Sequence, residues 1–167
     1  MGIRLIPAFV VAIILCDTLE ARPIGVWSYK ALAEQADLVL IGTVESIRAV
    51  DEKLDQSPFG DILEGRLTTF KVETVLKGNA SDAKIELVHF QVQATKNVPN
   101  GPLLATFVSK EHRLTITSVD GVEVKQERLE RKPEYLLFLK VRPDGRYEPV
   151  SGQVDSSFSA RKVLSAE

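Results

Sequence analysis

Residues 67–76 read LTTFKVETVL, and this stretch decides the fold class because its residues alternate in character. The positions on one side are apolar or β-branched: Phe70, Val72, Thr74 and Leu76. The positions between them are polar: Thr69, Lys71 and Glu73. A repeat of two is typical of a β-strand with one buried face. Gly78 follows and ends the pattern, so the stretch predicts an amphipathic strand.

Strand character recurs along the rest of the chain. We expect further strands in residues 36–47 (ADLVLIGTVESI), 84–92 (KIELVHFQV), 103–108, 135–141 (YLLFLKV) and 146–150. Residues 158–164 fit either one more strand or a final helical turn. In residues 84–92 the apolar positions change side, which favours a bulge near Leu87 and Val88.

Turn signals separate these strands. Asp120–Gly121, with apolar residues alternating on both sides, predicts a tight hairpin. Residues 49–65 and 93–102 are polar and contain proline and glycine. We expect the first to be a long loop or a flexible hairpin tip and the second to be a loop. The mixed charges of residues 127–132 (ERLERK) favour a solvated turn or short helix. Ser28 can cap a short helix over residues 28–35.

Seven or eight short strands after one helix place the chain in the mainly β class. We expect a closed or partly open antiparallel OB-type β-barrel with a short N-terminal helix, because closure hides strand edges. A two-sheet sandwich is the alternative. Residues 22–167 are expected to form this single domain, with its core in about residues 28–152.

The first residues predict export. Arg4 precedes an apolar run over residues 5–15, and polar residues and Pro23 follow, which is the layout of a secretory signal peptide over residues 1–21. The run is too short for a permanent membrane-spanning helix. The expected location is therefore secreted or periplasmic. The single cysteine, Cys16, is removed with the signal or, alternatively, lipidated, so no disulfide is expected in the domain.

Four segments together resemble the netrin-like domain, the OB-type barrel also found in tissue inhibitors of metalloproteinases. They are ADLVLIGTV (residues 36–44), TFKVETVLKG (69–78), YLLFL (135–139) and DGRY (144–147). Secreted bacterial proteins without cysteines are similar as well. The resemblance implies an OB-type fold. In the inhibitors a first cysteine binds the zinc of the protease, whereas here no cysteine follows Cys16, so the resemblance transfers no functional residue.

No pattern of catalytic residues stands out, and no cofactor is expected. The sequence contains no Gly-x-Ser-x-Gly motif and no Gly-rich phosphate loop, and Ser159–Lys162 matches Ser-x-x-Lys without its companion motifs. His89 and His112 are the only histidines, and a shared metal site would need carboxylates as well. With 21 Lys and Arg against 23 Asp and Glu, no basic stripe favours nucleic acid.

These observations favour an exported, non-catalytic binding module for an extracytoplasmic protein or a small ligand. Trp27, Asn97 and Asn100 are the candidate partner contacts, the first beside the export segment and the others in the loop over residues 93–102. One alternative is a protease inhibitor that acts through residues 49–65 and 93–102. The other is a hydrolase or metal-dependent enzyme, which would require His89 to meet two carboxylates in one pocket.

Overall fold

The computed structural model of the 167-residue chain describes residues 24–54, 57–80, 82–94, 98, 100–119 and 123–163. In residues 111–119 and 123–131 it describes the backbone alone. The expected signal peptide, Cys16 and Asn97 lie outside these residues. The elements, in chain order, are α1 (Tyr29–Gln35), β1 (Leu38–Ala49), η1 (Gly60–Ile62), β2 (Leu63–Lys77), β3 (Lys84–Val92), β4 (Glu111–Val119), β5 (Glu123–Arg131), β6 (Glu134–Val141), β7 (Tyr147–Pro149), η2 (Ser156–Phe158) and β8 (Ala160–Val163).

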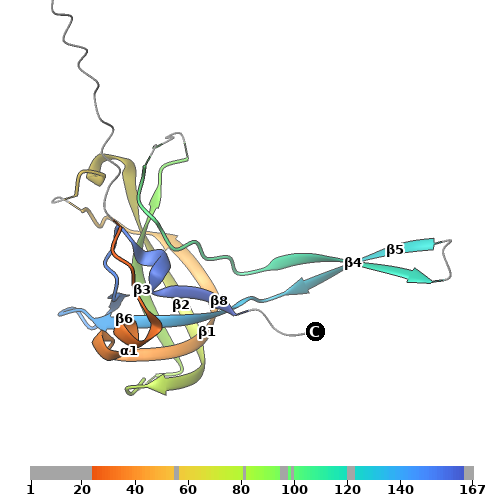
Figure 1. Cartoon of the computed structure of the whole chain (residues 1–167), viewed down its shortest axis with the longest axis horizontal. Coiled ribbons are helices and arrows are strands. Elements are labelled where there is room, and N and C mark those ends of the chain that lie inside the picture. The colour runs from red at the N-terminus through yellow and green to blue at the C-terminus, as the bar shows by residue number, and fades with distance from the viewer. Residues whose placement is uncertain are drawn as a thin grey trace, which may run out of the picture.

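Five strands close a β-barrel in the order β1-β2-β3-β7-β6, with β6 pairing back to β1 (Figure 1). Neighbouring strands are antiparallel except β3 and β7, which are parallel at Leu87 and Tyr147. This order is consistent with an OB-like fold. The expected mainly β barrel with one short helix is confirmed, and the parallel pair makes it a mixed barrel. β8 pairs with the first half of β6, beside β7.

The register of β1 is irregular against β2 and unbroken against β6. Shifts against β2 fall between Val39 and Leu40, between Ile41 and Gly42, and between Val44 and Ser46. Bulges increase twist and curvature, which closure of a small barrel requires. At Gly42 an added Cβ would lie 2.8 Å from the Lys71 carbonyl oxygen, so the close approach of β1 and β2 depends on glycine.

The barrel interior is an apolar cluster that all five closing strands help to build. Its buried members are Leu38, Leu40, Val44, Phe70, Ile85, Leu87, Ala105, Phe107, Tyr135, Leu137 and Leu139, and Tyr147 of β7 packs against them. Each fully buried aliphatic or aromatic side chain contributes roughly 1.5–3 kcal/mol. Phe107 meets Phe70 and Tyr135 edge to face, with ring centroids 5.0 and 5.1 Å apart.

The expected bulge in β3 is absent. The β2–β3 register runs without a break from Leu63 and Val92 to Lys71 and Lys84. Ile85, Leu87 and His89 therefore share one face of β3, and Val88 and Phe90 share the other. Both faces are buried. Apolar residues occupy both phases because β3 is covered on two sides, not because the strand changes phase.

Helix α1 covers the outside of the barrel. The Ser28 hydroxyl accepts a hydrogen bond from Ala31 N at 3.1 Å, as expected of a helix N-cap. At the other end, Lys77 Nζ donates to the carbonyls of Ala33 and Ala36 at 2.7 and 2.6 Å, a favourable place for a cation. Leu32 of α1 then packs against a second buried cluster on the outer face.

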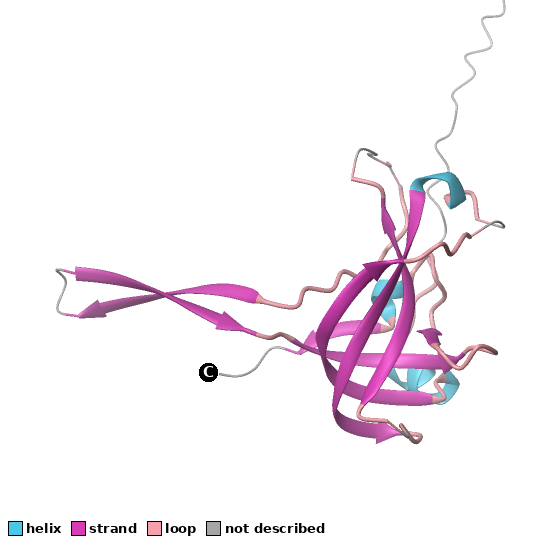
Figure 2. Cartoon of the chain, turned by 180° about the vertical axis from the view of Figure 1, so that it is seen from behind, coloured by secondary structure: helices cyan, strands magenta, loops and turns pink. Residues whose placement is uncertain are grey.

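β4 and β5 form a long two-stranded hairpin, here called the arm. Figures 1 and 2 show it projecting from the barrel beside β8. Its pairing runs from Glu111 and Arg131 to Val119 and Glu123, and neither strand pairs with another described strand. The expected antiparallel pairing of these two segments is confirmed, and the predicted turn at Asp120–Gly121 lies outside the described residues. Two boundaries are wrong: the charged residues 127–131 belong to β5, and β2 begins at Leu63, inside the expected loop.

Candidate functional site

A cleft opens at the base of the arm, between residues 104–108 and β8. Its volume is about 430 Å³. Residues 104–108 line one side and Ala160, Arg161 and Lys162 line the other. Since the chain enters β4 soon after Val108, the cleft and the arm form neighbouring parts of one surface.

The 103–108 segment lies across the cleft from β8 and forms no β-ladder with it. Ser157 N donates to Leu103 O at 3.0 Å, and Ala105 N donates to Ser156 Oγ at 2.9 Å. Ala105 and Phe107 are buried, whereas Thr106 and Val108 are exposed. The sequence predicted a strand here, but residues 103–108 form none: the alternation of burial is strand-like, while η2 and its side chains supply the hydrogen bonds.

Backbone polar groups face the cleft from the 103–108 segment. In an extended chain, alternate residues turn their N–H and C=O groups to the same edge. Leu103 and Ala105 use that edge to bond η2, so Phe107 turns its own groups toward β8. The backbone of Phe107 makes no hydrogen bond with another described residue.

β8 presents a complementary edge. Phe138 N donates to Ser159 O at 2.8 Å, which joins the start of β8 to β6, while Ser159 N donates to Ser156 O. By the alternation of an antiparallel ladder, Arg161 also pairs with β6, and Ala160 turns outward to the cleft. Within the described residues, the outward groups of Ala160 have no hydrogen-bond partner.

The floor of the cleft is apolar and its rim is basic. Phe107 and Tyr135 are 3% and 4% exposed. The Arg161 guanidinium lies 5.8 Å from the centroid of the Phe158 ring and has no carboxylate partner in the described part of the chain. An apolar floor between two backbone edges suits an extended peptide, and a cation on the rim favours an acidic one.

A second hollow, of about 300 Å³, is lined by charged residues of β3 and of the turn between β6 and β7. Beside it, Glu52 accepts hydrogen bonds from both Arg142 and Arg146, which joins the loop after β1 to this turn. Arg146 also donates to Asp144, and this bond is the main reason that the pKa of Asp144 falls to about 2. Both guanidinium groups are therefore already matched by carboxylates, and the cluster serves to connect two loops.

A third hollow lies on the outer face, between α1 and the strands beneath it. It has a volume of about 350 Å³ and an almost wholly apolar lining that includes Tyr29, Leu76 and Phe138. The Tyr29 and Phe138 rings lie 5.9 Å apart between centroids. Tyr29 and Leu76 are 58% and 57% exposed. Lys77, the charged residue of the lining, already donates to carbonyls at the end of α1, so nothing here indicates what would cover this face.

His89 lies in the barrel interior, away from solvent. Its Nε2 is 2.8 Å from Thr68 Oγ1, and its ring meets Phe107 at 4.9 Å between centroids. Burial lowers the pKa of His89 to about 4, so the imidazole is neutral near pH 7. His89 does not meet two carboxylates, as the hydrolase alternative required, and the described residues contain no group of His, Cys, Asp or Glu suited to a metal ion.

The Ser-x-x-Lys match does not build a catalytic pair. Residues 160–163 form a strand, so Lys162 is not one helical turn beyond Ser159. The buried Ser159 hydroxyl instead donates to Ser151 Oγ and accepts from Ser151 N, both at 2.8 Å. Ser159 thus holds the turn before β8 in place.

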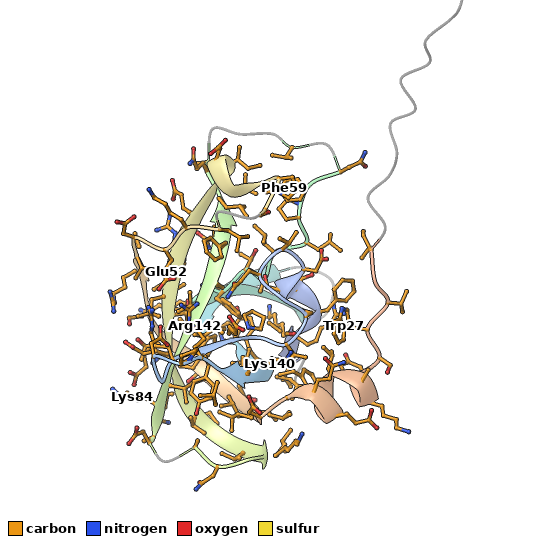
Figure 3. All side chains as sticks on the ribbon, turned by 90° about the vertical axis from the view of Figure 1, so that its left-hand side faces the viewer. Trp27, Glu52, Phe59, Lys84, Lys140 and Arg142 are labelled. Atoms are coloured by element: carbon orange, nitrogen blue, oxygen red, sulfur yellow. The ribbon has the colours of Figure 1, made fainter. Side chains whose placement is uncertain are left out.

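The predicted partner contacts are not brought together. Trp27 is half-buried and packs against the outer cluster around Leu32 and Phe138. Figure 3 places it on the α1 side of the barrel, opposite Glu52 and Arg142. Asn100 is exposed in the loop after β3 with φ of 54°, a conformation that asparagine tolerates. Asn97 lies outside the described residues.

The cleft was not expected from the sequence, although part of its signal is present. Residues 103–108 alternate between buried and exposed positions as a strand does. Nothing in the local sequence shows that the short helix η2, and not a strand, supplies their hydrogen bonds. Ser156 and Ser157, which make those bonds, are more than fifty residues away, as in the pair Ala105 and Ser156. A contact between such distant segments has no signature in a single sequence.

Among the described residues, no helix combines the length and apolar character needed to cross a membrane. Comparison with models of protein families, with curated proteins and with solved structures gave no match to this chain.

Proposed function

We propose that this chain is an exported, non-catalytic interaction module that binds another protein through the arm and the surface at its base. The observation that carries the proposal is the arm itself. β4 and β5 are nine residues each and pair with each other alone among the described strands.

A two-stranded ribbon of this kind gains little stability by itself. An isolated hairpin is marginal in water, because it has no second layer against which to bury a face. Its two outer edges also carry unpaired N–H and C=O groups, which readily accept a further strand. A partner that packs on the ribbon would bury one of its faces, and a partner strand that extends the ladder would bond its free edge.

The composition of the arm distinguishes its two edges. β5 (EVKQERLER) is rich in charged residues, which discourage unspecific pairing, whereas the centre of β4 (residues 114–117, LTIT) has high β-propensity and no charge. The β4 edge is therefore the side on which we expect a partner strand.

Export and the netrin-like relationship are part of the same proposal. The pattern of residues 1–21 supports a signal peptide, and with it a secreted or periplasmic location. The OB-like strand order and the helix before β1 are consistent with the netrin-like resemblance. Fold-level likeness of this kind suggests no ligand.

The test is partner capture with an arm-shortened variant. The exported protein and a variant in which residues 110–132 are replaced by a short Gly-Ser linker are immobilised and exposed to the exported fraction of the producing cell. A second variant, with residues 94–101 replaced in the same way, is the matched control. Thermal unfolding checks that each barrel still folds.

We expect a protein that binds the full chain and the loop control but not the arm-shortened variant. Equal capture by the arm-shortened variant would contradict the proposal. If only the 94–101 variant loses a captured protease, the loop-based inhibitor becomes the better account. Turnover of a substrate by the purified chain, abolished by a point mutation, would instead make it an enzyme.

A further inference from the structure

We infer that the cleft between residues 104–108 and β8 binds an extended, acidic segment of the partner by strand addition. The inference rests on the proposed function, because it names the part of the partner that the base of the arm would hold. It goes further in assigning a separate site, a binding mode and a peptide chemistry.

The first argument is the pair of backbone edges. Phe107 on one side and Ala160 on the other turn N–H and C=O groups toward the space between them, and neither backbone bonds another described residue there. An added strand could bond both edges at once. Such main-chain bonds supply affinity in strand addition, while the pockets for alternate side chains supply selectivity.

The second argument is the floor. Phe107 and Tyr135 are buried beneath the opening, and their rings meet edge to face. The side chains of a strand alternate, so every second residue of the added segment would face this apolar floor. Valine or another β-branched residue suits those positions.

The third argument is charge. Arg161 lines the cleft, and no described carboxylate pairs with it. Its guanidinium lies 5.8 Å from the centroid of the Phe158 ring, a contact that does not neutralise its charge. A glutamate or aspartate of the added segment would supply the missing counter-charge, and a lysine there would be repelled.

The experiment uses the full exported chain and a synthetic peptide of alternating valine and threonine with a central glutamate. Three matched peptides accompany it: one with lysine in place of glutamate, and two with N-methyl groups on either alternate set of amides. N-methylation removes backbone donors and leaves the side chains unchanged. Binding is measured by fluorescence anisotropy, and the site by hydrogen exchange of individual amides.

We expect the glutamate peptide to bind and to slow exchange at Phe107 and Ala160 but not at amides of the β4–β5 arm. Each of the two N-methylated peptides should bind about ten-fold more weakly, because each alternate set of amides faces one of the two edges and a lost hydrogen bond is worth roughly a factor of ten or less. Arg161→Glu should weaken binding of the glutamate peptide and strengthen binding of the lysine peptide. Arg161→Gln should make the affinities of the two peptides similar.

Several outcomes would overturn the inference. These are equal binding of all peptides, protection elsewhere on the barrel, or no binding at millimolar concentration. A concentration-dependent dimer of the chain that protects Phe107 and Ala160 would assign the cleft to a second copy instead. If the peptides fail while a partner is still captured through the arm, the proposed function stands and the cleft inference alone falls.

Discussion

Val108 N donates a hydrogen bond to Tyr135 Oη at 3.0 Å, and these two residues lie on either side of the arm in the chain. Val108 precedes β4 and Tyr135 follows β5 by a few residues. The Tyr135 ring is buried in the barrel core, so its hydroxyl fixes the point from which the arm departs. Both residues also line the cleft.

Tyr135→Phe should therefore loosen the arm base with little effect on core packing. We expect a loss of about 1 kcal/mol in the free energy of unfolding, the usual contribution of one hydrogen bond. Exchange at the Val108 amide should become faster. Tyr147→Phe is the matched control, because the Tyr147 hydroxyl has no hydrogen bond to a described residue. Urea unfolding and hydrogen exchange measure both effects, and equal behaviour of the two variants would contradict the assignment.

The pKa of Asp144 should lie near 2 and should depend chiefly on Arg146. The hydrogen bond from Arg146 is the largest cause of the lowered pKa of Asp144, and the charge of Arg142 contributes less. Because the folded pKa lies below the unfolded one, the stabilisation is present above about pH 4 and is lost as the pH falls toward 2. Arg146→Gln should raise the pKa of Asp144 toward its usual value, and Arg142→Gln should raise it less. Carboxyl carbon NMR measures both shifts, and the reverse order would refute the structure of this cluster.

Gly78 and Gly145 separate two reasons why a position requires glycine: a positive φ, and close approach of another backbone atom. Both have positive φ, 81° and 82°, so alanine at either position costs roughly 1–2 kcal/mol in the left-handed region. A Cβ at Gly145 would meet no atom within 4 Å, whereas one at Gly78 would collide with the Asp37 carbonyl oxygen. Gly78→Ala should therefore lose a further ~1–3 kcal/mol, as an overpacked site does. Denaturant unfolding compares the two variants, and equal losses would show that the close approach of β1 at Gly78 is not required.

The sequence predicted strands well where one face is buried and the other is wet. In β2 the expected alternation appears around Phe70, which is buried beside exposed Lys71, but Leu67 and Thr68 are both buried and Leu76 is exposed. β3 misled the prediction because it is covered on both sides, so its apolar residues fill both phases. A bulge and a doubly buried strand produce the same pattern in a short segment, and only the tertiary structure separates them.

β5 shows the opposite failure. Residues 127–131 are mostly charged, yet they pair with β4 along their whole length. An amphipathic pattern arises when one face meets a core, and an arm that leaves the barrel has no core to meet. The strand is defined by its register with β4, which composition does not report.

The candidate site was less predictable than the fold for a related reason. The sequence highlighted Trp27 because it lies beside the export segment, and two asparagines because they lie in a long loop. The cleft depends instead on backbone groups of Phe107 and Ala160, and every residue type carries such groups. Their availability becomes visible only when the partners of their neighbours are known.

His89 gives the last prediction, a dependence of stability on pH. Its pKa is about 4 in the folded barrel, where burial disfavours the imidazolium, against a usual value of 6.5. Between these values the unfolded chain binds a proton that the folded chain does not, so stability falls as the pH decreases from about 6.5 to 4. The slope approaches ~1.4 kcal/mol per pH unit and the total loss is about 3 kcal/mol. His89→Gln can still reach Thr68 Oγ1 but does not titrate, so its unfolding free energy should fall less over this range. His112 is present in both proteins, so its contribution cancels when the two pH profiles are subtracted. Parallel pH profiles for the two proteins in urea unfolding would show that His89 is accessible to protons in the native state.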